Sequence, residues 1–217
     1  MARRYYYRTF NEQTGRELSD RMADLKRALD FKPTYRVLDI GCAEGLISLE
    51  LAPFVSEIRA VDMRPARIQA AQRLAENLRI HNVQFEIASL FDLTLDPLSY
   101  DIVLFLGVYH QLPQSSRERA LRIVLHSAKH QVAIRTRIHR DFGVRDTILN
   151  ACREEGFEIT FERTYESARA RKTRGLRIMQ DWFSHSTTTL HKSLKLVASR
   201  VTASTFLFSV AAQILCV

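Results

Sequence analysis

The feature that most constrains the fold is the run VLDIGCAEG at residues 37–45. A short apolar run that ends in glycine is typical of a buried strand turning directly into a helix. The next segment has helical character and ends at Pro53, and a second strand, IRAVD, is expected at 58–62. Because strand and helix alternate from this point, the sequence predicts a parallel sheet with mainly right-handed crossovers.

The alternation of expected strands and helices continues along the chain. Further strands are expected at 83–89, 101–108, 131–136, 157–164 and 175–180, and helices at 17–30, 63–80, 115–128 and 144–156. The almost continuous apolar run at 101–108 should be a central strand that is buried on both faces. We therefore predict an α/β fold with a doubly wound, mostly parallel seven-stranded sheet and an antiparallel terminal hairpin.

Three regions follow from this pattern. Residues 1–34 form an N-terminal arm and an amphipathic helix, residues 35–184 form the α/β domain, and residues 185–217 form a C-terminal amphipathic or apolar helix. Residues 201–217 carry no charge, yet 17 residues fall just short of the roughly 20 needed to span a bilayer. The tail could dock on the domain or on a second subunit, lie at a membrane interface, or act as an anchor.

Composition excludes several classes of protein. A chain with 46% hydrophobic and 26% charged residues is globular, and three cysteines without paired spacing argue against a disulfide framework or a zinc site. The first twenty residues lack an apolar signal segment, so we expect a cytoplasmic location, with membrane association through the tail left open. The net charge of +8, which is concentrated at the two ends, would suit RNA, an acidic partner, an anionic membrane or simply a solvated surface.

Ligands of parallel sheets bind beyond the carboxyl ends of the strands, so the residues that follow each strand are the candidate site. Small residues at 41, 43 and 45 let the backbone turn tightly beside a bound molecule. Asp62 ends the second strand, 21 residues after Gly41, and a carboxylate there can accept both hydroxyls of a ribose. The spacing predicts a nucleoside cofactor. Leu46, in place of a third glycine, disfavours a nicotinamide-dependent dehydrogenase.

At these residues the chain resembles a known family. VLDIGCAEG resembles the first motif of class I S-adenosylmethionine-dependent methyltransferases, and Asp62 matches the acid at the end of that family's second strand. The segments FEIASLFDL, SYDIVLFLGVYHQL and EEGFEITFERT resemble later motifs in the same order, so that the likeness covers residues 35–180. Two positions depart from the family pattern: Ala43 replaces the middle glycine, and Ser89 stands where many members carry an acid.

The resemblance implies S-adenosyl-L-methionine as the cofactor and a role for each matching residue. Asp39 and the turn at 41–45 would hold its methionine end, Asp62 its ribose and Met63 one face of its adenine. Ser89 and Leu90 would flank the adenine edge. The full set of expected cofactor-binding residues is Asp39, Gly41, Cys42, Ala43, Gly45, Asp62, Met63, Ser89, Leu90, Phe105, Leu106 and Gly107. The last three would line the methionine side with their backbone.

His110 is the best candidate for a catalytic base because it follows the fourth strand and an imidazole titrates near neutral pH. The alternative is that it packs or shapes the substrate mouth. The histidines share no ligand spacing, so no metal site is expected, and Cys42 is expected to pack rather than to react.

The expected activity is methyl transfer in line to an O or N atom of a small-molecule, sugar or lipid-linked acceptor. The alternatives are an RNA methyltransferase and a non-catalytic scaffold that binds RNA or a catalytic partner, and a homo-oligomer stays open. The basic, tyrosine-rich segment at 1–10 would suit contacts with nucleic acid, and equally a terminal arm folded over the cofactor pocket.

Overall fold

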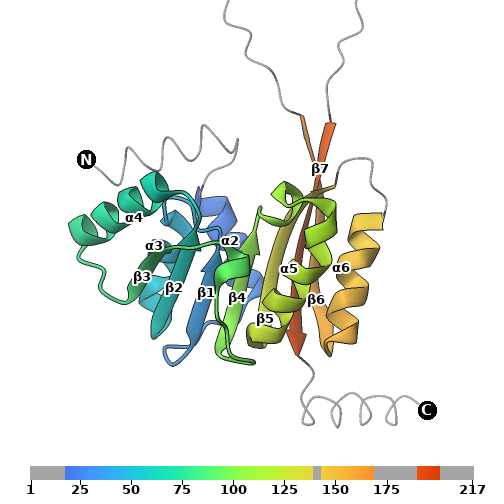
Figure 1. Ribbon diagram of the computed structural model, residues 1–217, viewed down its shortest axis with the longest axis horizontal. Helices are drawn as coiled ribbons and strands as arrows, with labels where there is room; N and C mark the ends of the chain where they lie inside the picture. Colours follow the sequence, from blue (N-terminus) through green and yellow to red (C-terminus); the bar gives the residue numbers. More distant parts are fainter. Residues whose placement is uncertain (1–17, 139–142, 169–189, 201–217) are drawn as a thin grey trace, which may run out of the picture.

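A computed structural model of the chain describes residues 18–138, 143–168 and 190–200 (Figure 1). These residues form one seven-stranded sheet in the order β3-β2-β1-β4-β5-β7-β6. The strands are β1 (Arg36–Ile40), β2 (Glu57–Asp62), β3 (Val83–Ile87), β4 (Tyr100–Leu106), β5 (Ala128–Ile138), β6 (Phe157–Ala168) and β7 (Leu190–Arg200). The main helices are α2 (Leu18–Ala28), α3 (Leu46–Leu51), α4 (Pro65–Leu78), α5 (Gln114–Ser127) and α6 (Gly143–Glu154). Short 3-10 turns lie at η1 (Ala52–Phe54), η2 (Leu90–Asp92) and η3 (Tyr109–Gln111).

The direction of the strands confirms the predicted fold class. Strands β1 to β5 pair in parallel, while β7 runs antiparallel between β5 and β6. The order reverses at β1 and β4, so the carboxyl ends of these two strands flank the crevice in which open α/β sheets bind ligands.

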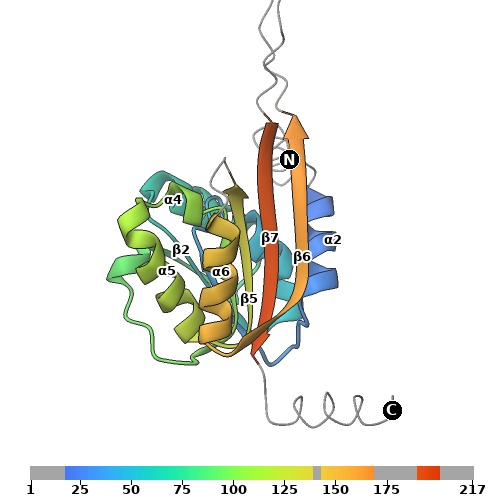
Figure 2. The ribbon, with the colours of Figure 1, turned by 90° about the vertical axis from the view of Figure 1, so that its right-hand side faces the viewer.

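Helices cover both faces of the sheet, and Figure 2 shows α2 on one side with α5 and α6 on the other. Buried side chains of α2, α3 and α4 share one apolar cluster with Ile102 and Leu104 of β4. Buried side chains of α5 and α6 share a second cluster with Val103 and Phe105, the alternate residues of the same strand. Since these four residues have no exposed surface, the prediction that this strand is buried on both faces is confirmed.

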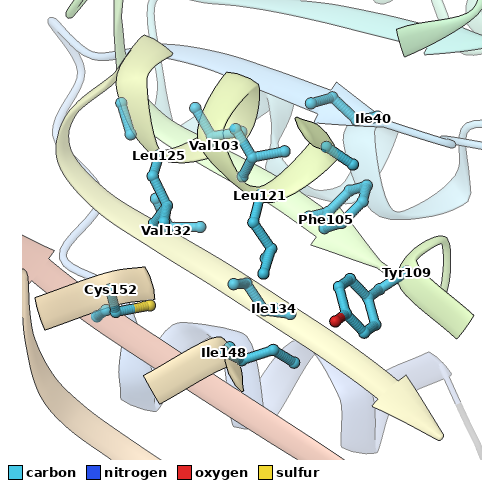
Figure 3. Packing of buried hydrophobic residues seen from close by; sticks show 14 of the residues in the cluster. Ile40, Val103, Phe105, Tyr109, Leu121, Leu125, Val132, Ile134, Ile148 and Cys152 are labelled. Atoms are coloured by element: carbon cyan, nitrogen blue, oxygen red, sulfur yellow. The ribbon is translucent and has the colours of Figure 1, made fainter. Parts of the chain in front are cut away.

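The second cluster joins the sheet to the helices α5 and α6 on one of its faces (Figure 3). Leu121 of α5 lies between Phe105 and Ile134 of the sheet, and Ile148 of α6 completes the contact. Each of these four residues exposes at most 1% of its surface to solvent. Close packing of this kind fixes the level at which β4 and β5 end, and so fixes the residues that follow them.

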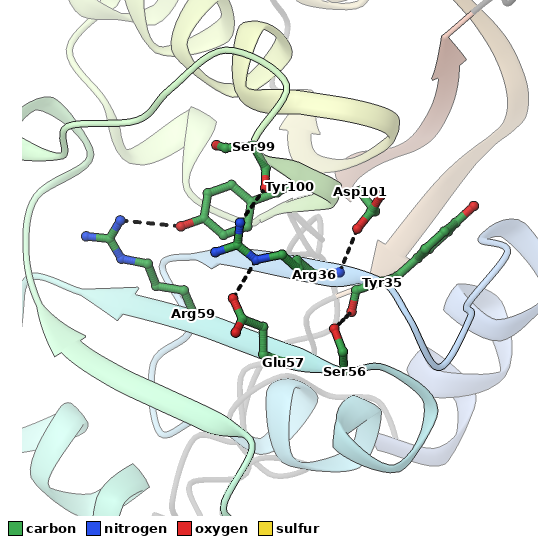
Figure 4. A network of polar contacts seen from close by, with 8 residues as sticks. All are labelled: Tyr35, Arg36, Ser56, Glu57, Arg59, Ser99, Tyr100 and Asp101. Carbon is green, nitrogen blue, oxygen red and sulfur yellow. Dashed lines mark hydrogen bonds and ion pairs between the residues drawn. The ribbon is translucent and has the colours of Figure 1, made fainter.

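Polar contacts tie the opposite, amino end of the sheet (Figure 4). The Arg36 guanidinium, at the start of β1, pairs with Glu57 of β2 at 2.6 Å and donates to the carbonyl of Ser99 at 3.2 Å. The Arg36 amide donates to Asp101 of β4 at 2.8 Å. The amino ends of three neighbouring strands are therefore locked by structural contacts, and the carboxyl ends remain for ligands.

The sequence-based prediction for the C-terminal region is wrong over Leu190–Arg200, which forms β7 instead of the start of a helix. The spacing of its apolar residues suits both a helix and a strand. In the strand, Leu196 and Ala198 point to the face covered by α5 and α6, where both are buried. Burial in the sheet therefore decided the structure. The strand expected at 175–180 and the tail beyond 200 lie outside the described residues. Within the described part, no helix has the length and apolar character to cross a membrane.

Candidate functional site

The turn after β1 is built on backbone conformations that favour glycine. Gly41, Ala43 and Gly45 have φ angles of +75°, +53° and +72°. The amides of Gly41 and Cys42 both donate to the carbonyl of Val61, at 2.8 and 3.0 Å, so the turn folds back over the end of β2. Its left-handed residues strain any side chain, and Ala43 bears that strain where the family pattern has glycine.

Packing also requires glycine at two of these positions. A Cβ atom at Gly41 would overlap the side chain of Val108, and one at Gly45 would overlap the ring of Phe85. These two packing partners were not anticipated from the sequence. Val108 follows β4 and Phe85 lies on β3, so the turn is held between segments that the chain brings in from either side.

Asp62 joins the turn to the end of β2. One carboxylate oxygen accepts from the Ala43 amide at 3.1 Å, and the other accepts from the Arg64 amide at 2.9 Å. The side chain is 8% exposed. Each carboxylate oxygen has a second lone pair, so Asp62 can hold the turn and still accept from a hydroxyl of a ligand.

Asp39 is the second carboxylate of the site and lies inside β1, buried beneath the turn. It accepts a hydrogen bond of 2.5 Å from the hydroxyl of Ser48, a fully buried residue of α3. Burial raises the pKa of Asp39 to about 6, and the nearby Asp62 adds to the shift. The sequence analysis missed Ser48, because a serine nine residues after the acid carries no pattern of its own.

Large apolar side chains lie in solvent beside Asp62. Met63 is 70% exposed and Ile87, which pairs with Asp62 across β2 and β3, is 52% exposed. Ser89 accepts from the Phe91 amide at 3.3 Å and so caps η2, while Leu90 is buried in the core. The exposed pair offers the apolar contact that a planar ring would use.

Backbone rather than side chain faces the site at the end of β4. The Phe105 ring is fully buried in the core, whereas Leu106 and Gly107 are half-buried. The Gly107 amide donates to the Arg135 carbonyl at 2.7 Å, and its own carbonyl accepts from the Gln111 side chain at 2.5 Å. These contacts fix the strand exit.

His110 lies in the middle of η3, one turn beyond Gly107, and is half-buried beside the fully buried Tyr109. Cys42 is also buried, and its burial together with the nearby carboxylates of Asp39, Asp62 and Glu44 raises the pKa of its thiol far above the usual range. A thiol in that environment packs and does not react. Among the described residues, no group of histidine, cysteine and acidic side chains could hold a metal ion.

The structure thus brings the expected residues to one edge of the sheet. Asp39, the turn, Asp62 and Met63 lie at the carboxyl ends of β1 and β2, and Gly107 and His110 lie across the crevice at β4. A model of the methyltransferase domain matches residues 31–170, most of the chain.

The chain belongs to the class I S-adenosylmethionine-dependent methyltransferases.

Two relatives of this methyltransferase are themselves named as methyltransferases. It is 34% identical over 108 residues to the magnesium-protoporphyrin O-methyltransferase of Rhodobacter capsulatus, a match that covers 48% of each chain. It is 31% identical over 81 residues to the ubiquinone biosynthesis O-methyltransferase of Coxiella burnetii, covering 37% of this chain and 34% of that one. The matches therefore span about half or less of these curated relatives.

Solved structures share the fold at low identity. A putative methyltransferase from Bacillus halodurans aligns with a TM-score of 0.66 at 14% identity, over 83% of this chain and 99% of that one. Magnesium protoporphyrin IX methyltransferase from Synechocystis, solved with bound S-adenosylmethionine, aligns with a TM-score of 0.61 at 18% identity, over 84% and 77%.

Gly45→Ala should destabilise the protein, because the new Cβ combines left-handed strain of about 1–2 kcal/mol with the overlap on Phe85. Ala43→Gly is the matched change at the neighbouring left-handed position and should be neutral or stabilise by up to about 1 kcal/mol. Urea denaturation of both variants measures the free energies of unfolding. If Gly45→Ala and Ala43→Gly lowered the free energy of unfolding by the same amount, left-handed strain would not define this turn.

Asp39→Asn should stabilise the cofactor-free protein above pH 6 and not below pH 4. The folded-state pKa of about 6 lies above the ordinary 3.8, so the stability contributed by protonated Asp39 is fully present below about pH 4. That contribution is lost as the pH rises through 6, whereas asparagine never ionises. Urea denaturation between pH 4 and 8 should show the gap between variant and wild type growing by roughly 1–3 kcal/mol. If the difference in unfolding free energy between variant and wild type stays constant from pH 4 to 8, the raised pKa of Asp39 is contradicted.

Proposed function

We propose that this chain transfers a methyl group from S-adenosylmethionine to an O or N atom of a small-molecule acceptor, a class that includes sugars and lipid-linked groups. The observation that carries the proposal is the meeting of the Asp62 carboxylate with the positive-φ turn at the crevice of the sheet. Two relatives named as O-methyltransferases of small molecules support the choice of acceptor.

The residues of the crevice fit the chemistry of this cofactor. Asp62 would accept from the ribose hydroxyls, and Met63 with Ile87 would contact the adenine through the apolar surface that they leave exposed. Asp39, the turn residues Cys42 to Gly45 and the backbone of 105–107 would surround the methionine end. Ser89 and Leu90 would border the adenine edge through their backbone, since the serine hydroxyl already caps η2.

When bound, S-adenosylmethionine supplies a methyl group that its positive sulfur has already activated. The protein therefore has to hold the acceptor in line, and alignment alone can supply roughly 7 to 11 kcal/mol of the barrier. The fixed backbone at Gly107 and the one-turn helix η3 set the position of His110 across the crevice from the turn. His110 would take the proton that an attacking hydroxyl or amine must lose.

The RNA alternative rests on residues 1–10, which lie outside the described residues. We propose the small-molecule acceptor because two relatives are named as O-methyltransferases of small molecules.

The test is transfer of tritiated methyl groups into cell extract separated into protein, RNA, lipid and small-molecule fractions. Label should enter the small-molecule or lipid fraction, and Asp62→Asn should weaken binding of S-adenosylhomocysteine by about 1.5–3 kcal/mol in calorimetry because a charged hydrogen-bond acceptor is lost. Asp146→Asn, at an exposed position of α6, is the matched control and should bind normally. Stabilisation by NAD with no binding of S-adenosylhomocysteine would overturn the proposal.

His110→Gln should lower kcat about 10²- to 10⁴-fold while the affinity for S-adenosylhomocysteine stays within twofold. Glutamine can still form hydrogen bonds but cannot act as a base. A variant with unchanged turnover would assign His110 to shaping the substrate mouth.

A further inference from the structure

One cation lies directly beside the methyl-transfer crevice. Arg135, near the end of β5, pairs with Leu106 of β4, and a Cβ atom added to Gly107 would lie 3.1 Å from its guanidinium nitrogen. The guanidinium therefore rests against the residue that ends β4. It lies on the side of the crevice opposite to Asp62, because β5 and β2 flank the β1–β4 pair on either side.

The register of the antiparallel strands extends this cation into a row. Arg135 of β5 pairs with Lys195 of β7, and Lys195 pairs with Arg163 of β6. Directly opposed positions share a face of the sheet, so three basic residues occupy one rung. Neighbouring strands are about 4.8 Å apart, and the rung therefore runs roughly 10 Å from Arg135 to Arg163.

Such a row is unfavourable in itself, since like charges opposite one another on neighbouring strands destabilise a sheet. The next rung on the same face, Arg137–Ser193–Tyr165, adds another cation. The acids of β6 lie elsewhere: Glu162 shares a rung with Leu196, which is buried on the face covered by α5 and α6, and Glu158, on the face of the row, lies two rungs further along, opposite Ser199. At these two rungs, four basic positions therefore share one face with no acidic position.

We propose that Arg135, at the head of the basic row that continues through the paired positions Lys195 and Arg163, binds an anionic group, a carboxylate or a phosphate, on the methyl acceptor. The row begins at the strand exit that borders the crevice and runs away from Asp62 and the turn, which would hold the cofactor. The single carboxylate of the cofactor could engage one end of the row, whereas three strands of basic positions suit an extended anion. The proposal rests on the proposed function and specifies its substrate class.

The bound anion is distinct from the atom that receives the methyl group. A guanidinium that donates hydrogen bonds to an oxygen withdraws the lone pair that the oxygen would need for attack. The acceptor would therefore carry at least two functional groups, an anion held over β5 and β7 and a nucleophile near His110. The row positions the acceptor, and the proton that the nucleophile loses as it takes the methyl group passes to His110.

The test starts from the small-molecule and lipid pools of a cell extract, each passed over an anion exchanger before the methyl-transfer assay. Acceptor activity should be in the retained fraction, and the small-molecule and lipid pools distinguish a free anion from a lipid headgroup. With that fraction, Arg135→Gln should raise the KM for the acceptor at least tenfold, because a charged hydrogen bond is lost. The dissociation constant of S-adenosylhomocysteine should stay within twofold, and Arg135→Lys should recover part of the KM.

Arg122→Gln, an exposed cation of α5 outside the row, is the matched control and should leave the KM unchanged. Arg135→Gln should also unfold at the same or a higher temperature than wild type, because one repulsive pair is removed, so a simple folding defect would be visible. Acceptor activity in the unretained or RNA fraction, or weaker binding of S-adenosylhomocysteine with an unchanged KM, would overturn the inference. A wild-type protein that transfers no methyl group would instead overturn the proposed function.

Discussion

The site depends on one carboxylate that serves two strands. Asp62 accepts from the amides of Ala43 and Arg64, so the turn after β1 is positioned by the end of β2 and not by its own sequence alone. Ordering a segment with three left-handed residues costs conformational entropy, and this anchor adds to the Val61 hydrogen bonds and to the packing against Val108 and Phe85 that hold the turn. The same carboxylate would contact the ribose, and cofactor binding and turn geometry are therefore coupled.

The two ends of the sheet differ in how well their groups are satisfied. At the amino end, Arg36 satisfies partners on β2 and β4, and the polar groups pair with one another. At the carboxyl end the chain instead buries the Asp39 carboxylate, leaves Met63 in solvent and places an alanine at positive φ. Each of these features opposes stability, and local violations that gather at one edge of a well-packed domain are typical of a functional site.

Much of this arrangement could be predicted from the sequence, because the decisive signals were local. The run at 37–45 and Asp62 gave the first two strands and the turn between them, and the apolar residues of α2 gave its buried face. The structure of β7 could not be predicted, because its leucines fit a helix as well as a strand and only burial against α5 and α6 distinguishes the two. The contacts of Phe85 and Val108 with the turn depend on pairing between distant segments, and Ser48 follows its acid by nine residues without a pattern of its own.

The insertion of β7 between β5 and β6 also explains how the two halves of the crevice differ. The parallel half takes its groups from strand ends that follow one another along the chain, which suits a constant ligand bound by short motifs. The antiparallel half combines rungs from three segments, so that Arg135, Lys195 and Arg163 become neighbours although the chain separates them widely. Substitutions in any one of those strands would alter the rung without disturbing Asp62 or the turn. A fold divided in this way can keep the strand ends that hold a cofactor while the antiparallel half changes.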